Sequence, residues 1–328
     1  MQTHCKRELL PLYDPNSTPR KKNSSTRCRT KSRRKARSCS KASSKRNELR
    51  PSGTHTLRWL DRSVKRIRPK QSLGQHFLRD NNIARKIIGS LHIQRDDLVL
   101  EIGPGEGALT HYLARQTDHL TVVDVDERVI ARMNAVYPHG EVAIVHQDFL
   151  DVDLASVRAG DERKLRIVGN IPYNITTPIL FHILDHRENV QDATLMMQRE
   201  VARRLVAQPR TKDYGILAVF CQMFADVTLL FDVSAQCFFP PPGVTSSVVR
   251  LTMLPEPRFP LTNEGFFRSM VRAVFGKRRK TLRNSLRYLL DVVPEPMAGI
   301  DLAQRPEDLP LEKLAALANA LARHKAAQ

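Results

Sequence analysis

Apolar and polar positions alternate in blocks between residues 98 and 207, and the blocks have the lengths of strands and helices. Short apolar runs favour strands, and the amphipathic stretch that follows each run favours a helix. Strands that alternate with helices predict an α/β fold with a doubly wound parallel sheet. The predicted strands are Leu98–Ile102, Leu120–Val125, Val142–Val145, Leu165–Val168 and Ala193–Met197, and the predicted helices cover about 106–116, 129–136, 177–184 and 200–207.

The pattern changes after Pro209. Tyr214–Phe224 is apolar and predicts a helix, whereas Val227–Phe231 and Ser247–Leu254 are rich in β-formers and predict an antiparallel pair at one edge of the sheet. From Thr262 onward the pattern is helical throughout. The predicted organisation is therefore a sheet-containing body and a small helical domain behind a proline-rich linker, with the bounds 68–257 and 258–328.

The first 67 residues have a different composition from the rest of the chain. The formal net charge is +19, but residues 1–70 hold 22 Lys and Arg against four acidic residues, which leaves a net of only +1 for the other 258 residues. Like charges repel, and the Lys, Arg and Ser of this segment offer little to bury, so we expect residues 1–67 to be disordered. The overall basicity alone does not indicate that the folded part binds nucleic acid.

Three interpretations of this basic tail stay open. It is an arm that adds salt-dependent affinity for RNA phosphates, an organelle transit peptide, or an extension upstream of the native start, for which Val64 is a candidate. The transit peptide would place the protein in a mitochondrion or plastid, and the other two interpretations place it in the cytoplasm.

The cysteines and the apolar runs exclude two further classes of protein. Cys5, Cys28, Cys39, Cys221 and Cys237 contain no CxxC pair and no zinc spacing, so we expect no metal site and a reducing compartment. The chain also lacks an uninterrupted apolar run of the length that a membrane span requires, so we expect no membrane partner.

The glycine-rich turn after the first strand points to a ligand without phosphate. The sequence VLEIGPGEGALT places Gly103, Gly105 and Gly107 where the chain leaves the sheet, and glycine lets backbone approach a ligand closely. A pyrophosphate would meet the following helix near Glu106, whose carboxylate would repel it. A structural tight turn is the alternative interpretation.

Acidic residues follow the next two strands at the same predicted edge of the sheet. Asp124 ends the second strand and can accept hydrogen bonds from both hydroxyls of a ribose, and Asp148 follows the third strand, where it can receive an adenine amino group. Each aspartate alone is equally well explained as a helix cap. Together with the glycine turn, they fit S-adenosylmethionine, which contains an adenosine but no phosphate.

The stretch GNIPYN, residues 169–174, ends the fourth strand at this same edge. The side-chain oxygen of Asn170 and the carbonyl of Ile171 are acceptors, Pro172 restricts Ile171 to extended conformations, and Tyr173 offers a flat ring. Two acceptors beside a ring fit the exocyclic amine of a base, whose lone pair becomes localised when its protons are hydrogen-bonded. Phe238 or Phe239 would supply a second ring.

In these motifs the chain resembles the KsgA-type rRNA adenine dimethyltransferases. The resemblance extends from about residue 70 to the end, and it rests on QSLGQHFL (71–78), LEIGPGEGALT (100–110), VVDVD (122–126), QDFL (147–150), GNIPYNITTPIL (169–180), MMQREVARRL (196–205), FFPPPGVTSSVVRL (238–251) and FGKRRKTLRNSL (275–286). It implies a Rossmann-like class I methyltransferase fold, a monomer, and four methyl transfers to two adjacent adenosines near the 3′ end of small-subunit rRNA.

The resemblance also assigns roles to single positions. Asp124 stands where the family usually has glutamate, and His76 where asparagine is common. The residues implied to bind S-adenosylmethionine are His76, Leu78, Gly103, Gly105, Asp124, Asp148 and Asn170, and those implied in catalysis are Asn170, Ile171, Pro172, Tyr173 and Phe238, with Tyr173 and Phe238 as the stacking pair.

One basic cluster lies in the otherwise nearly neutral part of the chain. It comprises Lys277, Arg278, Arg279, Lys280, Arg283 and Arg287, of which Arg279, Arg283 and Arg287 would share one face of a helix. We expect it to contact phosphates of an immature small ribosomal subunit.

Three alternatives to a small-subunit rRNA dimethyltransferase stay open. They are a methyltransferase for large-subunit rRNA of the macrolide-resistance type, an assembly factor with little turnover, and a nicotinamide-dependent oxidoreductase. Glu106 and the GNIPYN stretch argue against the last.

Overall fold

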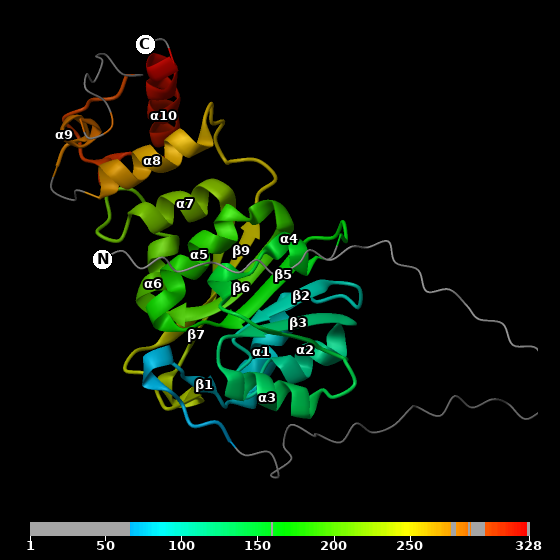
Figure 1. Cartoon of the computed structure of the whole chain (residues 1–328). Coiled ribbons are helices and arrows are strands. Elements are labelled where there is room, and N and C mark those ends of the chain that lie inside the picture. Colours follow the sequence, from blue (N-terminus) through cyan, green and yellow to red (C-terminus); the bar gives the residue numbers. More distant parts are fainter. Residues whose placement is uncertain (1–65, 159, 277–279, 288, 290–298, 327–328) are drawn as a thin grey trace, which may run out of the picture. The chain divides into compact units, whose positions relative to one another are not determined.

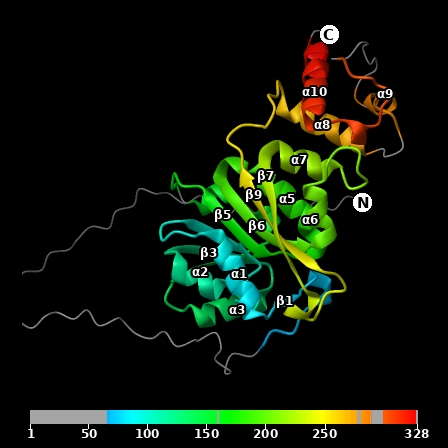
Figure 2. The same cartoon turned by 180° about the vertical axis from the view of Figure 1, so that it is seen from behind.

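The computed structural model describes residues 66–158, 160–276, 280–287, 289 and 299–326, all of which belong to one compact unit. A seven-stranded sheet with the strand order β4-β3-β2-β5-β6-β9-β7 forms its centre (Figure 1 and Figure 2). The strands are β2 (Leu98–Ile102), β3 (His119–Asp124), β4 (Ala143–His146), β5 (Leu165–Asn170), β6 (Val190–Gln198), β7 (Ala225–Val233) and β9 (Ser246–Met253).

The directions of the strands confirm the predicted topology. β4, β3, β2, β5 and β6 run parallel, and β9 lies antiparallel between β6 and β7. The chain order reverses where β2 lies between β3 and β5, and ligands of open α/β sheets bind outside the carboxyl ends of the strands at such a point.

Successive residues of the strands are buried on opposite faces of the sheet. Leu100, Val123 and Ile167 belong to one apolar cluster, whereas their chain neighbours Val99 and Val168 belong to the other. This follows from the two-residue period of a strand, and the central strands β2 and β5 are almost entirely buried because both faces of the sheet are covered there.

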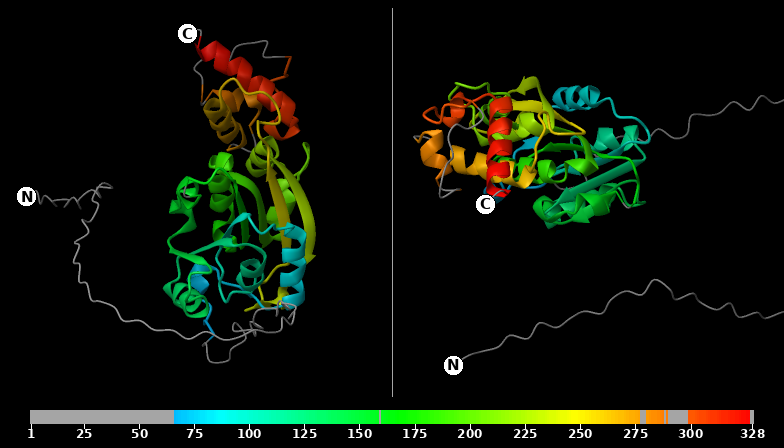
Figure 3. Two further views of the ribbon diagram at one scale, coloured as in Figure 1. Left: turned by 90° about the vertical axis from the view of Figure 1, so that its right-hand side faces the viewer. Right: turned by 90° about the horizontal axis from the view of Figure 1, so that it is seen from above.

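Helices cover both faces (Figure 3). The side chains of α1, α2 and α3 join the cluster on one face, and those of α4, α5, α6 and α7 join the cluster on the other. The bounds are α1 (Asn81–Leu91), α2 (Thr110–Gln116), α3 (Glu127–Val136), α4 (Leu154–Val157), α5 (Thr176–Asp185), α6 (Arg199–Leu205) and α7 (Ile216–Phe224).

Two local features differ from the predicted elements. The helix expected from about 106 begins only at Thr110, because Gly103, Gly105 and Gly107 all have positive φ and keep the chain in a turn. In addition, β1 (Phe77–Leu78) pairs with β8 (Phe238–Phe239) in a separate two-stranded sheet. Strands of two residues leave no periodic pattern, so these two could not be predicted from the sequence.

The C-terminal helices are α8 (Glu264–Phe275), α9 (Leu282–Leu286) and α10 (Leu311–Ala326). Phe267 of α8 packs edge-on against Phe220 and Phe224 of α7, with ring centroids 6.2 and 6.5 Å apart. The described part of these helices therefore shares an apolar cluster with one face of the sheet. The domain boundary at residues 257/258 stays a prediction.

The shared helix face predicted for the basic cluster is wrong. α9 begins at Leu282, because Thr281 has an extended backbone and its hydroxyl accepts a hydrogen bond from the Asn284 N–H as an N-cap. A continuous helix from Arg279 to Arg287 is thus interrupted at Thr281. Lys277, Arg278 and Arg279 themselves lie outside the described residues.

None of the helices in the described ranges has both the length and the apolar character needed to cross a membrane. Within the same ranges, no three His, Cys, Asp or Glu side chains come together as a metal site would require.

Candidate active site

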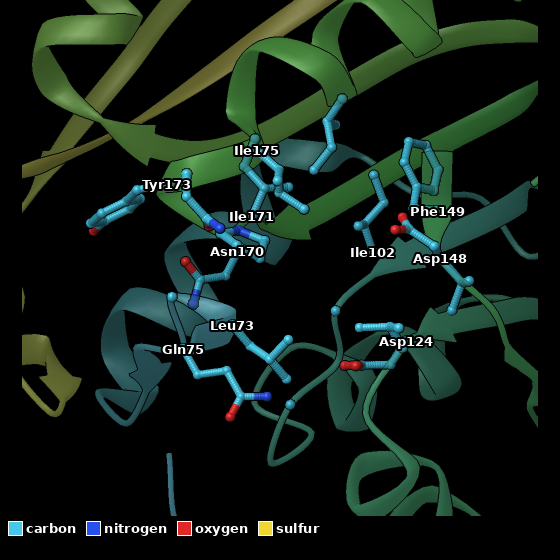
Figure 4. Close-up of a pocket in the computed structure, with 18 of the residues that line it drawn as sticks. Leu73, Gln75, Ile102, Asp124, Asp148, Phe149, Asn170, Ile171, Tyr173 and Ile175 are labelled. Carbon is cyan, nitrogen blue, oxygen red and sulfur yellow. The ribbon is translucent and has the colours of Figure 1, made fainter. Parts of the chain in front are cut away.

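A pocket opens at the carboxyl ends of β2, β3 and β5, where the strand order reverses (Figure 4). Most of the residues singled out from the sequence line it: His76, Gly103, Gly105, Asp124, Asp148, Asn170, Ile171, Pro172 and Tyr173. Figure 4 shows Asp124 and Asp148 on its right-hand side and Asn170 and Tyr173 on its left. The fold thus brings the ends of four predicted strands together in one cavity, marked by the glycine turn, Asp124, Asp148 and Asn170.

The glycine turn brings bare backbone to the pocket. Gly105 has a φ of 55°, and a Cβ placed on it would lie 2.8 Å from the Phe77 ring. Gly103 has a φ of 64°, and a Cβ there would lie 3.9 Å from the Asn170 carbonyl oxygen. Both positions therefore require glycine for their backbone conformation, and Gly105 also for the close approach of another segment.

Asp124 ends β3 with a carboxyl group directed into the pocket (Figure 4). One of its oxygens accepts the Asp126 N–H at 2.8 Å, which holds the group in place. Burial raises the pKa of Asp124 to about 6, so the group is ionised at neutral pH but close to its titration range. A partly buried carboxylate of this kind can accept hydrogen bonds from two neighbouring hydroxyls.

Asp148 and Phe149 follow β4 on the same side of the pocket. Asp148 Oδ1 accepts the Leu150 N–H at 3.0 Å as a cap, and the residue also lines the cavity. Phe149 is buried and Val125 is 52% exposed, and both line the pocket. The cap and ligand interpretations of Asp148 are therefore compatible, because the cap uses one of its two oxygens.

The orientation of the Asn170 amide is fixed by a contact that the sequence did not predict. Its Nδ2 donates to the His76 carbonyl oxygen at 2.8 Å. Because a carbonyl can only accept, the NH₂ group faces His76 and the Oδ1 atom is left as an acceptor. The predicted acceptor at the end of β5 is thus available in the pocket.

Tyr173 is anchored at both its hydroxyl and its ring. The hydroxyl is 2.6 Å from Ser246 Oγ on β9, and the ring stacks on the His76 imidazole with centroids 5.6 Å apart and planes at 25°. His76 Nδ1 lies 2.7 Å from the Pro240 carbonyl oxygen, so Nδ1 donates there. Tyr173 is therefore held by Ser246 at its hydroxyl and by His76 at its ring.

The chain matches the family model for ribosomal RNA adenine dimethylases over residues 66–323. The chain belongs to this family. A small-subunit rRNA methyltransferase A of Chlorobium phaeobacteroides is 47% identical over 251 residues, which cover 76% of this chain and 93% of that protein. A protein of the same description from Coxiella burnetii is 38% identical, with 79% of this chain and all of that protein covered.

Two solved structures support the same assignment. A dimethyladenosine transferase from Plasmodium falciparum is 26% identical, with a TM-score of 0.62, over 74% of this chain and 96% of that one. The 23S rRNA methyltransferase ErmE is 27% identical, with a TM-score of 0.56, over 75% of this chain and 99% of that one. The chain thus has the class I methyltransferase fold, as the dimethylase resemblance implied.

Two residues implied by the dimethylase resemblance lie apart from the pocket lining. Phe238 is only 4% exposed, because it pairs with Leu78 across the β1–β8 ladder and packs into one apolar cluster. Among the described ring contacts of Tyr173, the partner is His76 and not Phe238. Leu78 is likewise buried. The next residue, Phe239, is 44% exposed, with the Arg79 guanidinium 3.8 Å from its ring centroid.

The described part of the basic cluster lies on α9 and beside it. Lys280, Arg283 and Arg287 are exposed, and none of them lines the pocket. Their role as phosphate contacts stays a prediction.

In the segment that covers the pocket, only His76 and Leu78 were singled out from the sequence. Ser72, Leu73, Gly74, Gln75 and Phe77 also line the cavity beside His76, and none of these five was singled out. Glu106, whose place at the glycine turn had no assigned partner, accepts the Ile67 N–H at 3.3 Å. The QSLGQHFL motif was the available signal, but its contacts depend on residues distant in the chain.

Proposed function

We propose that this dimethylase transfers methyl groups from S-adenosylmethionine to the 6-amino groups of two adjacent adenosines near the 3′ end of small-subunit rRNA. The observation that carries the proposal is the Asn170 amide, whose Oδ1 is presented as an acceptor beside the glycine turn and Asp124. An adenine amine needs such an acceptor, and an adenosine-bearing cofactor needs the rest of the pocket.

The residues on the Asp124 side of the pocket fit the cofactor (Figure 4). Asp124 offers its carboxylate to the ribose hydroxyls, and Asp148 with Phe149 offers an acceptor and an apolar wall to the adenine. The glycine turn leaves room for the methionine end because Gly103 and Gly105 carry no side chains. When bound, S-adenosylmethionine supplies an electrophilic methyl group.

The residues on the Asn170 side of the pocket fit the target base (Figure 4). Asn170 Oδ1 and the Ile171 carbonyl accept hydrogen bonds from the amine, which localises the nitrogen lone pair as the new bond forms. Pro172, with φ −59° and ψ 134°, directs the chain out of β5, and Tyr173 stacks on the base. The amine loses its proton after alkylation, when the nitrogen is acidic. The protein therefore needs only to position the amine and to polarise it through hydrogen bonds.

The target adenosine must be unstacked from any helix to enter this pocket, so a loop is the preferred substrate. The exposed Lys280, Arg283 and Arg287 would hold the surrounding phosphates. We propose an immature small ribosomal subunit as the partner, a monomer as the active form and the cytoplasm as the compartment.

The experiment compares two RNA substrates. Purified protein is incubated with labelled S-adenosylmethionine and either immature small subunits or large-subunit rRNA, and the digested RNA is analysed for dimethyladenosine. We expect label in a fragment from the 3′ end of the small-subunit RNA. Label on large-subunit RNA alone would replace the proposal with the activity that the name of ErmE describes, and binding of small subunits without label would indicate an assembly factor.

A further inference from the structure

Residues 67–79, named here the strap, cross the glycine turn and cover one side of the cofactor pocket. Six consecutive strap residues, 72–77, line the cavity. The strap contains little regular structure of its own, only a short 3₁₀ turn at Gln71–Leu73 and the two residues of β1. Its position therefore depends on contacts with the rest of the protein.

Glu106 holds both ends of the strap. Its Oε1 accepts the Ile67 N–H at 3.3 Å, and its Oε2 lies 3.6 Å from Arg79 Nε. The carboxylate is 14% exposed, so these contacts are shielded from solvent.

Asp126 holds the middle of the strap. The carboxylate is 1% exposed and accepts Gln75 Nε2 at 2.9 Å, while Lys70 Nζ lies 3.7 Å away. Arg128 donates Nε to Asp126 at 2.9 Å, and its hydrogen bonds hold the pKa of Asp126 well below the usual range. The carboxylate therefore stays charged, and a buried charge strongly favours the closed arrangement that pairs it.

Arg128 also reaches the strap directly. Its Nη1 donates to the Arg68 carbonyl at 2.8 Å, and its Nη2 lies 3.4 Å from Gln75 Oε1. Gln75 Oε1 in turn accepts the Lys70 N–H at 2.9 Å. Both ends of the Gln75 amide are thus engaged, which orients this residue and the backbone on either side of it.

The residue after Gln75 is His76, whose carbonyl accepts the Asn170 amide at 2.8 Å. A continuous path of contacts consequently runs from Arg128 and Asp126 through Gln75 to the acceptor at the end of β5. Arg128 does not line the pocket, so any influence it has on catalysis passes through the strap.

We propose that Asp126, Arg128 and Gln75 are positioning residues that hold the strap closed over the bound cofactor and thereby fix His76 against Asn170. Loosening these contacts increases the rate of cofactor dissociation and lets the Asn170 amide adopt other orientations. The methyl-transfer part of this proposal rests on the proposed function, whereas the cofactor-retention part does not.

The first test replaces Arg128 with alanine and leaves the pocket lining intact. The matched control is Arg95→Ala, which removes an exposed arginine that pairs with Asp118 at 2.7 Å. The rate of S-adenosylmethionine dissociation is measured without RNA. We expect about a tenfold increase for Arg128→Ala, a smaller one for Arg128→Lys, which keeps the charge but not the forked donors, and none for Arg95→Ala. Equal dissociation rates for Arg128→Ala and the parent would overturn the proposal.

A second test separates positioning of Asn170 from a general loss of structure. Gln75→Ala is measured in the parent and in an Asn170→Ala background, with single-turnover methyl transfer at saturating cofactor. We expect a several-fold loss of rate in the parent and almost none in the Asn170→Ala background, since the acceptor to be positioned is gone. Equal losses in both backgrounds would contradict the path through His76. If the parent methylates no RNA, the proposed function fails, and the dissociation rates still test the strap.

Discussion

Replacing Asn170 with alanine removes the amine acceptor while leaving the cofactor side of the pocket in place. The lost Oδ1 acceptor acts where charge develops in the reaction, and one preorganised group of this kind is worth about 10²–10³-fold in rate, or about 2.7–4 kcal/mol. The same change leaves the His76 carbonyl without its 2.8 Å partner. An unsatisfied group costs about 1–3 kcal/mol of folding stability when it is buried.

The assay is single-turnover methyl transfer to small-subunit RNA at saturating S-adenosylmethionine, with cofactor affinity measured separately by calorimetry. We expect the rate to fall at least a hundredfold, while the cofactor dissociation constant changes by less than about fivefold. Asn134→Ala is the matched control, because Asn134 is exposed on α3 and its amide donates to the Ile130 carbonyl of the same helix. Turnover within a few-fold of the parent for Asn170→Ala would refute the acceptor argument.

Three further substitutions test other parts of the pocket. Asp124→Asn should weaken cofactor binding about 10–100-fold at pH 7.5 and flatten its pH profile by calorimetry, because the parent, with its pKa of about 6, loses the charged acceptor only as pH falls through that value. Gly105→Ala should lower the melting temperature and abolish cofactor binding, since φ is 55° and the added Cβ would lie 2.8 Å from Phe77. The control is Gly89→Ala, whose added Cβ would have no neighbouring atom within 4 Å and which should stabilise the fold by about 0.4–1 kcal/mol. Burial raises the pKa of Glu101 from 4.5 to about 8, so the folded chain keeps a proton that the unfolded chain releases, and stability falls as pH rises through this window. Glu101→Gln should therefore raise the melting temperature more at pH 8.5 than at pH 5. Equal shifts at the two pH values would count against a buried acid.

The order of strands and the edge that carries the site could be predicted because each strand is a strong local signal. Leu98–Ile102 was predicted with its bounds, since four of its five residues are apolar and a glycine turn follows. Asp124 and Asn170 were predicted to share an edge because parallel strands end together, and both line the pocket.

The remaining features arise from contacts between residues far apart in the chain. The Asn170 amide is oriented by a backbone carbonyl 94 residues away, and Gln75 is held by a carboxylate 51 residues away. Phe238 was expected to face Tyr173, but the β1–β8 pairing, which two residues per strand cannot signal, buries its ring instead. Local pattern contains no information on such partners.

The proposed mechanism places Asn170 Oδ1 between the bound cofactor and the amine of the target adenosine. The most direct measurement is a crystal structure of the protein with S-adenosylhomocysteine and a short RNA that carries an unpaired adenosine. We expect the adenine N6 atom at about 3 Å from Asn170 Oδ1, with the base stacked on Tyr173. An adenine whose N6 points away from Asn170 while the cofactor occupies the pocket would contradict it.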